Sequence, residues 1–236
     1  LYQDHENKEI LLELVRFKST KNDGLISFSE YVDGMSGDQK SIYYITGGNE
    51  STLKNSPLLE MYNNKSIEVL ILDDEIDEII ISAVPKYKDI NLKSVTHSDA
   101  AEDMKDESDK DAEKAVKPFI KKVKKVLGDQ VKDVLASTRL TESPSCIVTD
   151  QNDPSVQMRE MMRSMGQGAN IPEIKPILEI NPEHSIVKRL SKMRKGKAFD
   201  NICQLLLDQA LLVDGAKLNN PAEFVGRLNS VLEESL

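Results

Sequence analysis

Apolar runs and helical stripes alternate in the first hundred residues. The segment Ser41–Thr46 is rich in β-branched and aromatic residues, which predicts a strand. A nearly all-apolar run at Ile67–Leu72, which contains Glu68, predicts a second strand that is buried on both faces. Between them, Ser51–Asn63 has the spacing of helical turns interrupted at Pro57. This order predicts a βαβ unit within a parallel sheet.

Helices and an extended tail are predicted around this unit. Apolar spacing predicts a first helix over Asn7–Phe17. Ser27 precedes Glu30 by three residues, which is the spacing of a capping box at the start of a short helix. Asp74–Ala83 is expected to be helical, and Tyr87–Val95 to be extended. The predicted helix at Asp74–Ala83 would have one apolar side, made of Ile76, Ile79, Ile80 and Ala83.

A change in composition marks a boundary after residue 98. Asp99–Glu113 holds eight acidic residues and two lysines, and predicts either a flexible linker or the solvated start of a long helix. From Ala115 to Leu127 the apolar residues form a clean helical stripe, which Gly128 is placed to end. We expect domains at 1–98 and 114–236, joined by 99–113.

The second domain combines strands and helices. Val131–Leu135, Cys146–Thr149 and Ile177–Ile180 are predicted strands. Asn181 and Pro182 have the order of a helix cap and first-turn proline, so a helix is predicted to begin there. The fold class is therefore α/β followed by α+β.

Two amphipathic segments close the sequence. Ala198–Val213 is apolar nearly all round, so it must be buried on more than one side. Asn220 and Pro221 predict a capped helix that continues to Leu236. The pair could pack wholly on its own domain, or two copies could form a dimeric four-helix bundle. We favour the dimer, with an interface made of Leu206, Ala210, Leu211, Phe224, Val225, Leu228, Val231 and Leu232.

Composition narrows the possible functions. The net charge of −9 disfavours broad nucleic-acid binding, and no apolar run is long enough to cross a bilayer. Cys146 and Cys203 form no metal or disulfide pattern, which suggests buried thiols in a reducing compartment. The chain begins at Leu1, and we interpret it as part of a longer protein.

Two charged clusters could carry chemistry. Asp73 and Asp74 follow the buried strand, where a Mg²⁺-dependent α/β enzyme would place carboxylates. The favoured alternative is that they cap the following helix. Lysines between Lys114 and Lys125 could bind a membrane or nucleic acid. The adjoining acidic segment favours a solvated helix face instead, so we expect neither partner.

A methionine-rich segment is a candidate protein-binding surface. It begins at Pro154, which can open a helix, and polar residues flank it. Methionine is flexible and is frequent on adaptable binding surfaces, although an ordinary core helix is an equal alternative. The helix would place four methionines on one face, namely Met158, Met161, Met162 and Met165.

Several segments, in order along nearly the whole chain, resemble the heat-shock protein 90 chaperone family, and its bacterial form most closely. Together they are specific, although no single one would be. The segments are Leu14–Thr20, Tyr31–Val32, Gln39–Thr46, Ser56–Pro57, Ile67–Leu70, Ile76–Glu78, Arg139–Thr141, Glu179–Pro182 and Leu205–Leu212.

The resemblance implies the end of the middle domain followed by the C-terminal dimerisation domain. The ATP-binding domain would lie elsewhere in the parent protein. This chain is therefore expected to hold no cofactor and to catalyse nothing, whereas its cytoplasmic parent would use ATP and Mg²⁺. The chain ends Glu233–Leu236, without the acidic tail that recruits tetratricopeptide-repeat helpers, so those partners are not expected.

The resemblance also implies a homodimer that binds unfolded or partly folded client proteins. Pro154, Met158, Met161 and Met162 take the place of the family's client-binding helix, and Met165 shares their face. On the middle-domain side, the implied client-binding residues are Glu78, Ile79 and Ser82. The family often has a tryptophan at the position of Ile79, so the apolar contact is kept in altered form.

Overall fold

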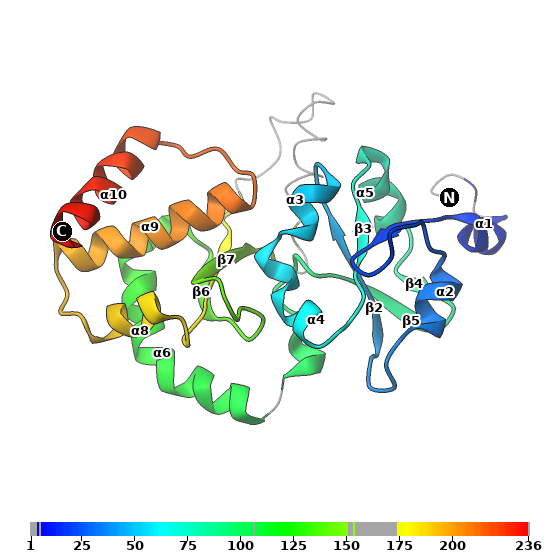
Figure 1. Ribbon diagram of the computed structural model, residues 1–236, viewed down its shortest axis with the longest axis horizontal. Helices are drawn as coiled ribbons and strands as arrows, with labels where there is room; N and C mark the ends of the chain where they lie inside the picture. The colour runs from blue at the N-terminus through cyan, green and yellow to red at the C-terminus, as the bar shows by residue number, and fades with distance from the viewer. Residues whose placement is uncertain (1–3, 5, 106, 151–152, 154–173, 236) are drawn as a thin grey trace. The chain divides into compact units, whose positions relative to one another are not determined.

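The computed structural model describes residues 4, 6–105, 107–150, 153 and 174–235 (Figure 1). These residues divide into two units, and the boundary along the chain falls between Asp103 and Met104. Each unit is built on its own sheet, and both sheets mix parallel and antiparallel pairs. The mixed class of helices and strands predicted from the sequence is therefore confirmed.

The predicted βαβ unit is present in the first unit. Strand β2 (Ser41–Thr46) runs parallel to β3 (Leu70–Leu72), with Tyr44 opposite Leu70. Every residue of β3 is buried, as expected for a strand that is covered on both faces. The connection contains short helical segments on either side of the Pro57 interruption, namely α3 (Glu50–Lys54), η1 (Pro57–Leu59) and α4 (Glu60–Asn64).

The predicted extended tail enters the same sheet. Strand β5 (Ile90–Ser94) pairs parallel with the free side of β2. Two short antiparallel strands, β1 (Lys18–Ser19) and β4 (Lys86–Tyr87), complete the order β1-β3-β2-β5-β4.

Helices cover both faces of this sheet. On one face, the core contains Ile42 of β2 together with side chains of three helices. On the other, the ring of Tyr43 lies 4.9 Å from that of Tyr62 in α4. The alternation of Ile42 and Tyr43 follows from the two-residue period of a strand. The three helices of the first face are α1 (Lys8–Leu14), α2 (Phe28–Asp33) and α5 (Glu75–Ser82).

The prediction for the first helix was too long by one turn. Helix α1 ends at Leu14, and Phe17 forms a bridge with Ile26. Phe17 continues the helical spacing of apolar residues, but it lies in an extended segment. From there its ring packs on the ring of Phe28, with 4.8 Å between the ring centroids. The predicted capping box is confirmed, since the Ser27 amide donates to Glu30 at 2.8 Å and the Glu30 amide donates to the Ser27 hydroxyl at 3.1 Å.

The second unit contains the three predicted strands. They are β6 (Asp133–Ala136), β7 (Ser145–Val148) and β8 (Ile177–Ile180), in the order β6-β8-β7. The central strand β8 runs parallel to β6 and antiparallel to β7. Four helices accompany this sheet in the described residues, namely α6 (Glu107–Leu127), α8 (Ser185–Lys192), α9 (Lys197–Val213) and α10 (Pro221–Ser235).

Helix α6 begins within the acidic segment. Residues 107–113 belong to this helix, and Gly128 follows its end with a positive φ of 54°. The helix packs along β6 and α9, and its Phe119, Val123 and Leu127 enter the core.

The predicted start of the next helix was wrong by three residues. Helix α8 begins at Ser185, and His184 caps it. The Asn181 side chain instead accepts a hydrogen bond from the amide of Glu183 at 2.9 Å, which forms a turn.

Candidate protein-binding surfaces

Helix α9 uses one face to complete the core of its own unit. Phe199, Cys203, Leu206, Leu207 and Ala210 are buried at helical spacing, and the helix packs along β7 and α6. Two of the predicted dimer-interface residues, Leu206 and Ala210, are 1% and 3% exposed. These two side chains therefore stabilise the single chain and leave almost no surface for a second one.

Helix α10 carries the exposed apolar surface of the hairpin. Val225, Leu228 and Leu232 are 49%, 39% and 50% exposed, and they share one side of the helix. The predicted interface residues Phe224 and Val231 are half-buried on the same helix, which packs along α9. Leu211 is half-buried against the core. We define Val225, Leu228 and Leu232 as the α10 stripe.

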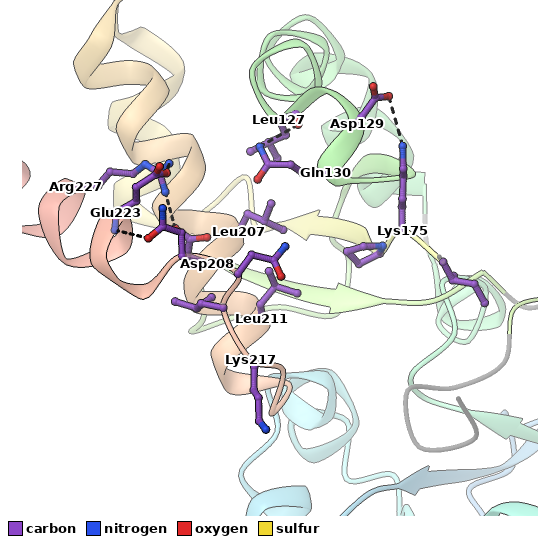
Figure 2. Close-up of a pocket in the computed structure, with 15 residues that line it drawn as sticks. Leu127, Asp129, Gln130, Lys175, Leu207, Asp208, Leu211, Lys217, Glu223 and Arg227 are labelled. Carbon is purple, nitrogen blue, oxygen red and sulfur yellow. Dashed lines mark hydrogen bonds and ion pairs between the residues drawn. The ribbon is translucent and has the colours of Figure 1, made fainter. Parts of the chain in front are cut away.

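An ionic contact joins the two helices of the hairpin. Arg227 of α10 donates to Asp208 of α9 at 3.2 Å and to Glu223 at 2.6 Å (Figure 2). Burial raises the pKa of Asp208, and the neighbouring Arg227 opposes that shift. The predicted cap of α10 is confirmed, because the Asn220 side chain accepts from the Glu223 amide at 3.3 Å. These contacts order the hairpin within one chain.

A buried ion pair brings together two of the segments that carry the family resemblance. Arg139 and Glu179 are 1% and 4% exposed, and Nε of Arg139 lies 3.0 Å from Oε2 of Glu179. The second carboxylate oxygen accepts from Nη2 at 3.1 Å, and Ser137 donates to the first at 2.7 Å. Sequence reasoning missed this pair. A glutamate inside the apolar strand Ile177–Ile180 was the available signal, because a buried carboxylate requires a partner.

Helix α5 holds the predicted client-binding residues of the first unit. Ile81 is buried in the core, whereas Ile76 is 47% exposed and Ile79 is half-buried. Glu78 is also half-buried, and the exposed Ser82 hydroxyl donates to the carbonyl of Ile79 at 2.9 Å. Apolar side chains of α5 therefore remain accessible to solvent.

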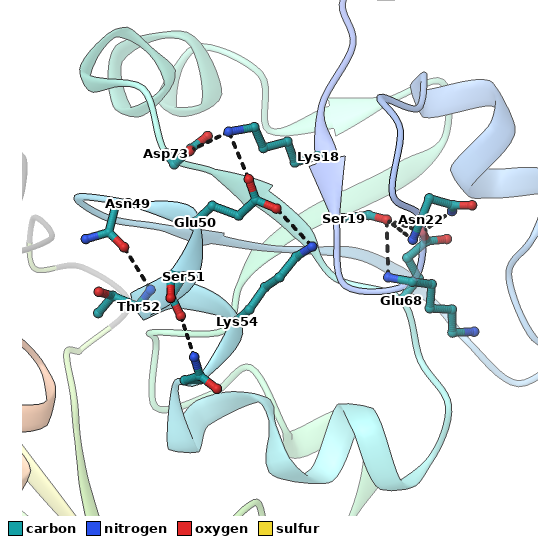
Figure 3. Close-up of polar contacts among 12 residues, drawn as sticks. Lys18, Ser19, Asn22, Asn49, Glu50, Ser51, Thr52, Lys54, Glu68 and Asp73 are labelled. Atoms are coloured by element: carbon teal, nitrogen blue, oxygen red, sulfur yellow. Dashed lines mark hydrogen bonds and ion pairs between the residues drawn. The ribbon is translucent and has the colours of Figure 1, made fainter.

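The carboxylates considered for a metal site are occupied by other contacts. Lys18 lies 2.7 Å from Asp73 and 3.1 Å from Glu50 (Figure 3). The hydrogen bond to Asp73 is the largest cause that raises the pKa of Lys18. The Asp74 amide donates to Asp77 at 3.3 Å at the start of α5. In the part of the chain that the structure describes, no group of histidines, cysteines and carboxylates is arranged to hold a metal. The enzyme alternative is unsupported.

The methionine-rich candidates lie outside the described residues, but the ends of their connection are defined. Those candidates are Pro154, Met158, Met161, Met162 and Met165. Strands β7 and β8 are antiparallel, with Val148 opposite Ile177, so the connection leaves and re-enters the sheet at one end. Lys132 holds Asp150 near that end at 3.1 Å. The residues at both ends of this connection are therefore fixed by the sheet.

The lysines of α6 and the two cysteines are the remaining candidates from the sequence. Lys114 and Lys124 of α6 pair with Asp111 and Asp133, at 3.0 and 2.8 Å. No helix among the described residues has the length and apolar character needed to span a bilayer. Both cysteines are buried, and burial raises the pKa of the Cys203 thiol to about 12. The described residues thus form two units of helices and strands, and the second unit ends in an ordered helical hairpin with exposed apolar side chains.

Comparison with known proteins identifies the family. The family model for Hsp90 protein matches residues 1–236. The chain is 48% identical to Chaperone protein HtpG of Treponema denticola, over 98% of this chain and 37% of that protein. It is 44% identical to the HtpG of Borrelia garinii subsp. bavariensis and 43% identical to that of Sulfurovum sp., each over 100% of this chain and 38% of the relative. The chain belongs to the Hsp90 family and is of the bacterial HtpG type. It spans less than two-fifths of the length of these relatives.

Proposed function

We propose that this chain is the homodimerising and client-binding part of a cytoplasmic molecular chaperone. The exposed α10 stripe on an ordered hairpin is the observation that carries the proposal. The chain itself performs no catalysis. ATP and Mg²⁺ act in other parts of the parent protein, whose folding cycle this piece serves.

Pairing of two hairpins would remove the α10 stripe from water. Burying a whole leucine or valine side chain contributes about 1.5–3 kcal/mol. The three stripe residues are 39–50% exposed, so their burial contributes about 2–4 kcal/mol for each chain on that scale. Twofold symmetry doubles this contribution, which supports a four-helix bundle of two copies. Leu212 and Val213 at the end of α9 are also exposed.

Client binding is supported by two other features. The connection between β7 and β8 carries four methionines at helical spacing on a base that is fixed at both ends. In the first unit, α5 keeps Ile76 exposed and Ile79 half-exposed, although apolar side chains normally enter the core. Adaptable methionines and exposed isoleucines suit unfolded proteins, which offer varied apolar side chains.

A double substitution of the methionines tests the client assignment. Met158→Ser with Met162→Ser should weaken binding of reduced, carboxymethylated α-lactalbumin at least tenfold, measured by fluorescence anisotropy. Urea unfolding of the variant should match that of the parent sequence. Arg159→Ser with Arg163→Ser is the matched control, because it alters the same segment and keeps all four methionines. If the methionine variant instead loses several kcal/mol of stability, these side chains belong to a core and the client assignment is wrong.

A further inference from the structure

A cavity of about 690 Å³ lies within the second unit, beside the hairpin (Figure 2). It is lined by the end of α6, the residues that lead into β8, both hairpin helices and the loop that joins them. Its size is in the range of pockets that bind organic ligands. Four half-buried apolar side chains form part of its wall, namely Ile174, Pro176, Leu211 and Leu218.

Three carboxamide side chains line the same cavity. Gln130 donates to the carbonyl of Leu127 at 3.2 Å, and the oxygen of Asn220 accepts from the Glu223 amide at 3.3 Å. Within the described residues, the Gln130 oxygen, the Asn220 amino group and the whole Asn219 amide have no protein partner. A carboxamide offers a donor and an acceptor, which are the groups that a peptide bond requires.

The charged groups of the wall are largely paired with one another. Lys175 lies 3.5 Å from Asp129, and Arg227 contacts both Asp208 and Glu223. Lys217 is the sixth charged residue of the wall and has no ion pair among the described residues. The other five are paired, so they do not require an occupant with a net charge. Apolar contacts and free carboxamides together favour an uncharged ligand with a peptide-like backbone.

We propose that this cavity binds a short extended peptide with leucine-like side chains, as part of an unfolded client. The identity of the partner rests on the proposed function. Ile174 and Pro176 belong to the β7–β8 connection, whose methionines lie outside the described residues. Glu223 and Arg227 line the cavity, whereas the α10 stripe lies outside its lining. Pairing through the stripe would leave the cavity open.

Methyl NMR of the whole chain tests the proposal. The probe is the acetylated and amidated pentapeptide Gly-Leu-Val-Leu-Gly, and the control probe replaces its apolar residues with serine and threonine. We expect the apolar peptide to cause saturable shifts of the Leu211 and Ile174 methyls at millimolar concentration, and the polar peptide to cause none. Equal shifts with both peptides, or no shift with either, would overturn the assignment.

Two loop variants separate occupancy of the cavity from general surface binding. Leu218→Trp should fill the cavity, and Leu218→Asp should remove its apolar contact, so each should raise the dissociation constant at least tenfold. Leu212→Trp is the matched control, because Leu212 is 45% exposed and does not line the cavity. Unchanged binding by both Leu218 variants refutes the site.

The methionine variant distinguishes this site from the proposed function. In Met158→Ser with Met162→Ser, the peptide-induced shifts of Leu211 and Ile174 should persist. If they disappear, the peptide binds the methionine segment and the cavity assignment fails, while the proposed function stands. If they persist although that variant binds clients normally, the cavity is a peptide site and the role of the methionines is wrong.

Discussion

Leu228→Asp is the sharpest test of the dimer. Leu228 lies in the middle of the α10 stripe, with 39% of its surface exposed in the single chain. A carboxylate there can remain hydrated in the monomer, so the fold of the chain should survive. In the dimer, the same carboxylate would be buried twice, once in each copy, without a cation from the stripe. The substitution therefore acts against the assembly rather than the folded chain.

The expected magnitude follows from the exposed fraction. Burying a whole leucine contributes about 1.5–3 kcal/mol, so the exposed share of Leu228, 39%, contributes about 0.6–1.2 kcal/mol per chain. Leu228→Ala removes most of this contribution from both copies, and should raise the dimer dissociation constant roughly tenfold. Leu228→Asp adds the desolvation of two carboxylates, which costs several kcal/mol for each ion. A total loss of at least about 4 kcal/mol raises the constant roughly 1000-fold.

Sedimentation equilibrium over a concentration series measures this constant. The unaltered chain should be a dimer at micromolar concentration, and Leu228→Asp a monomer with an unchanged circular dichroism spectrum. Ile186→Asp is the control, because Ile186 on α8 is 45% exposed and lies outside the hairpin. A monomeric parent chain, or a dimer that tolerates Leu228→Asp with less than a threefold change, would refute the assignment of the α10 stripe.

Three further substitutions test the interior and the helix ends. Glu179→Gln should cost about 3–5 kcal/mol in urea unfolding because it leaves Arg139 charged and buried. A double change of both residues to methionine should cost far less, and equal losses would contradict a coupled pair. Gly128→Ala should cost about 1–2 kcal/mol, since an L residue is strained at φ 54° and no atom lies within 4 Å of an added Cβ. An unchanged unfolding midpoint would exclude that strain. Cys203 should resist iodoacetamide at pH 8 until urea unfolds the chain, since burial raises its pKa to about 12. Its contribution to stability is full below the unfolded pKa of about 8.5 and is lost as the pH rises through the folded value. Rapid labelling of the native chain would contradict this.

Local signals predicted the secondary structure well where the interaction that fixes it lies within a few residues. The Ser27–Glu30 box and the Asn220 cap each depend on atoms three residues apart, and both form. Leu70–Leu72, directly before Asp73 in sequence order, form a buried strand parallel to β2 because none of the three side chains is polar. The same reasoning was wrong for Phe17, because its position is fixed by a ring contact with Phe28, eleven residues away, and not by helical spacing.

Contacts between distant segments were not available from the pattern. Ala198–Val213 was predicted to need burial on more than one side, but periodicity cannot tell which side meets the sheet. The structure buries Leu206 and Ala210 in the core of the second unit and leaves Val225, Leu228 and Leu232 exposed on α10. The ion pair of Arg139 and Glu179 joins residues forty positions apart, so neither residue alone identifies its partner.

Helix α5 shows why exposed apolar surface has to be read from the packed structure. The sequence places Ile76, Ile79 and Ile80 on one side, which in an ordinary surface helix would face the core. In the structure, Ile81 enters the core instead of these three residues. Asp77 also lies on the partly buried side of the helix, where burial raises its pKa. The isoleucine side is consequently left partly exposed. An apolar side directed to solvent lowers solubility unless a partner covers it. The same conflict between pattern and packing occurs at the α10 stripe, so in both units it marks the surface where a second protein chain is expected.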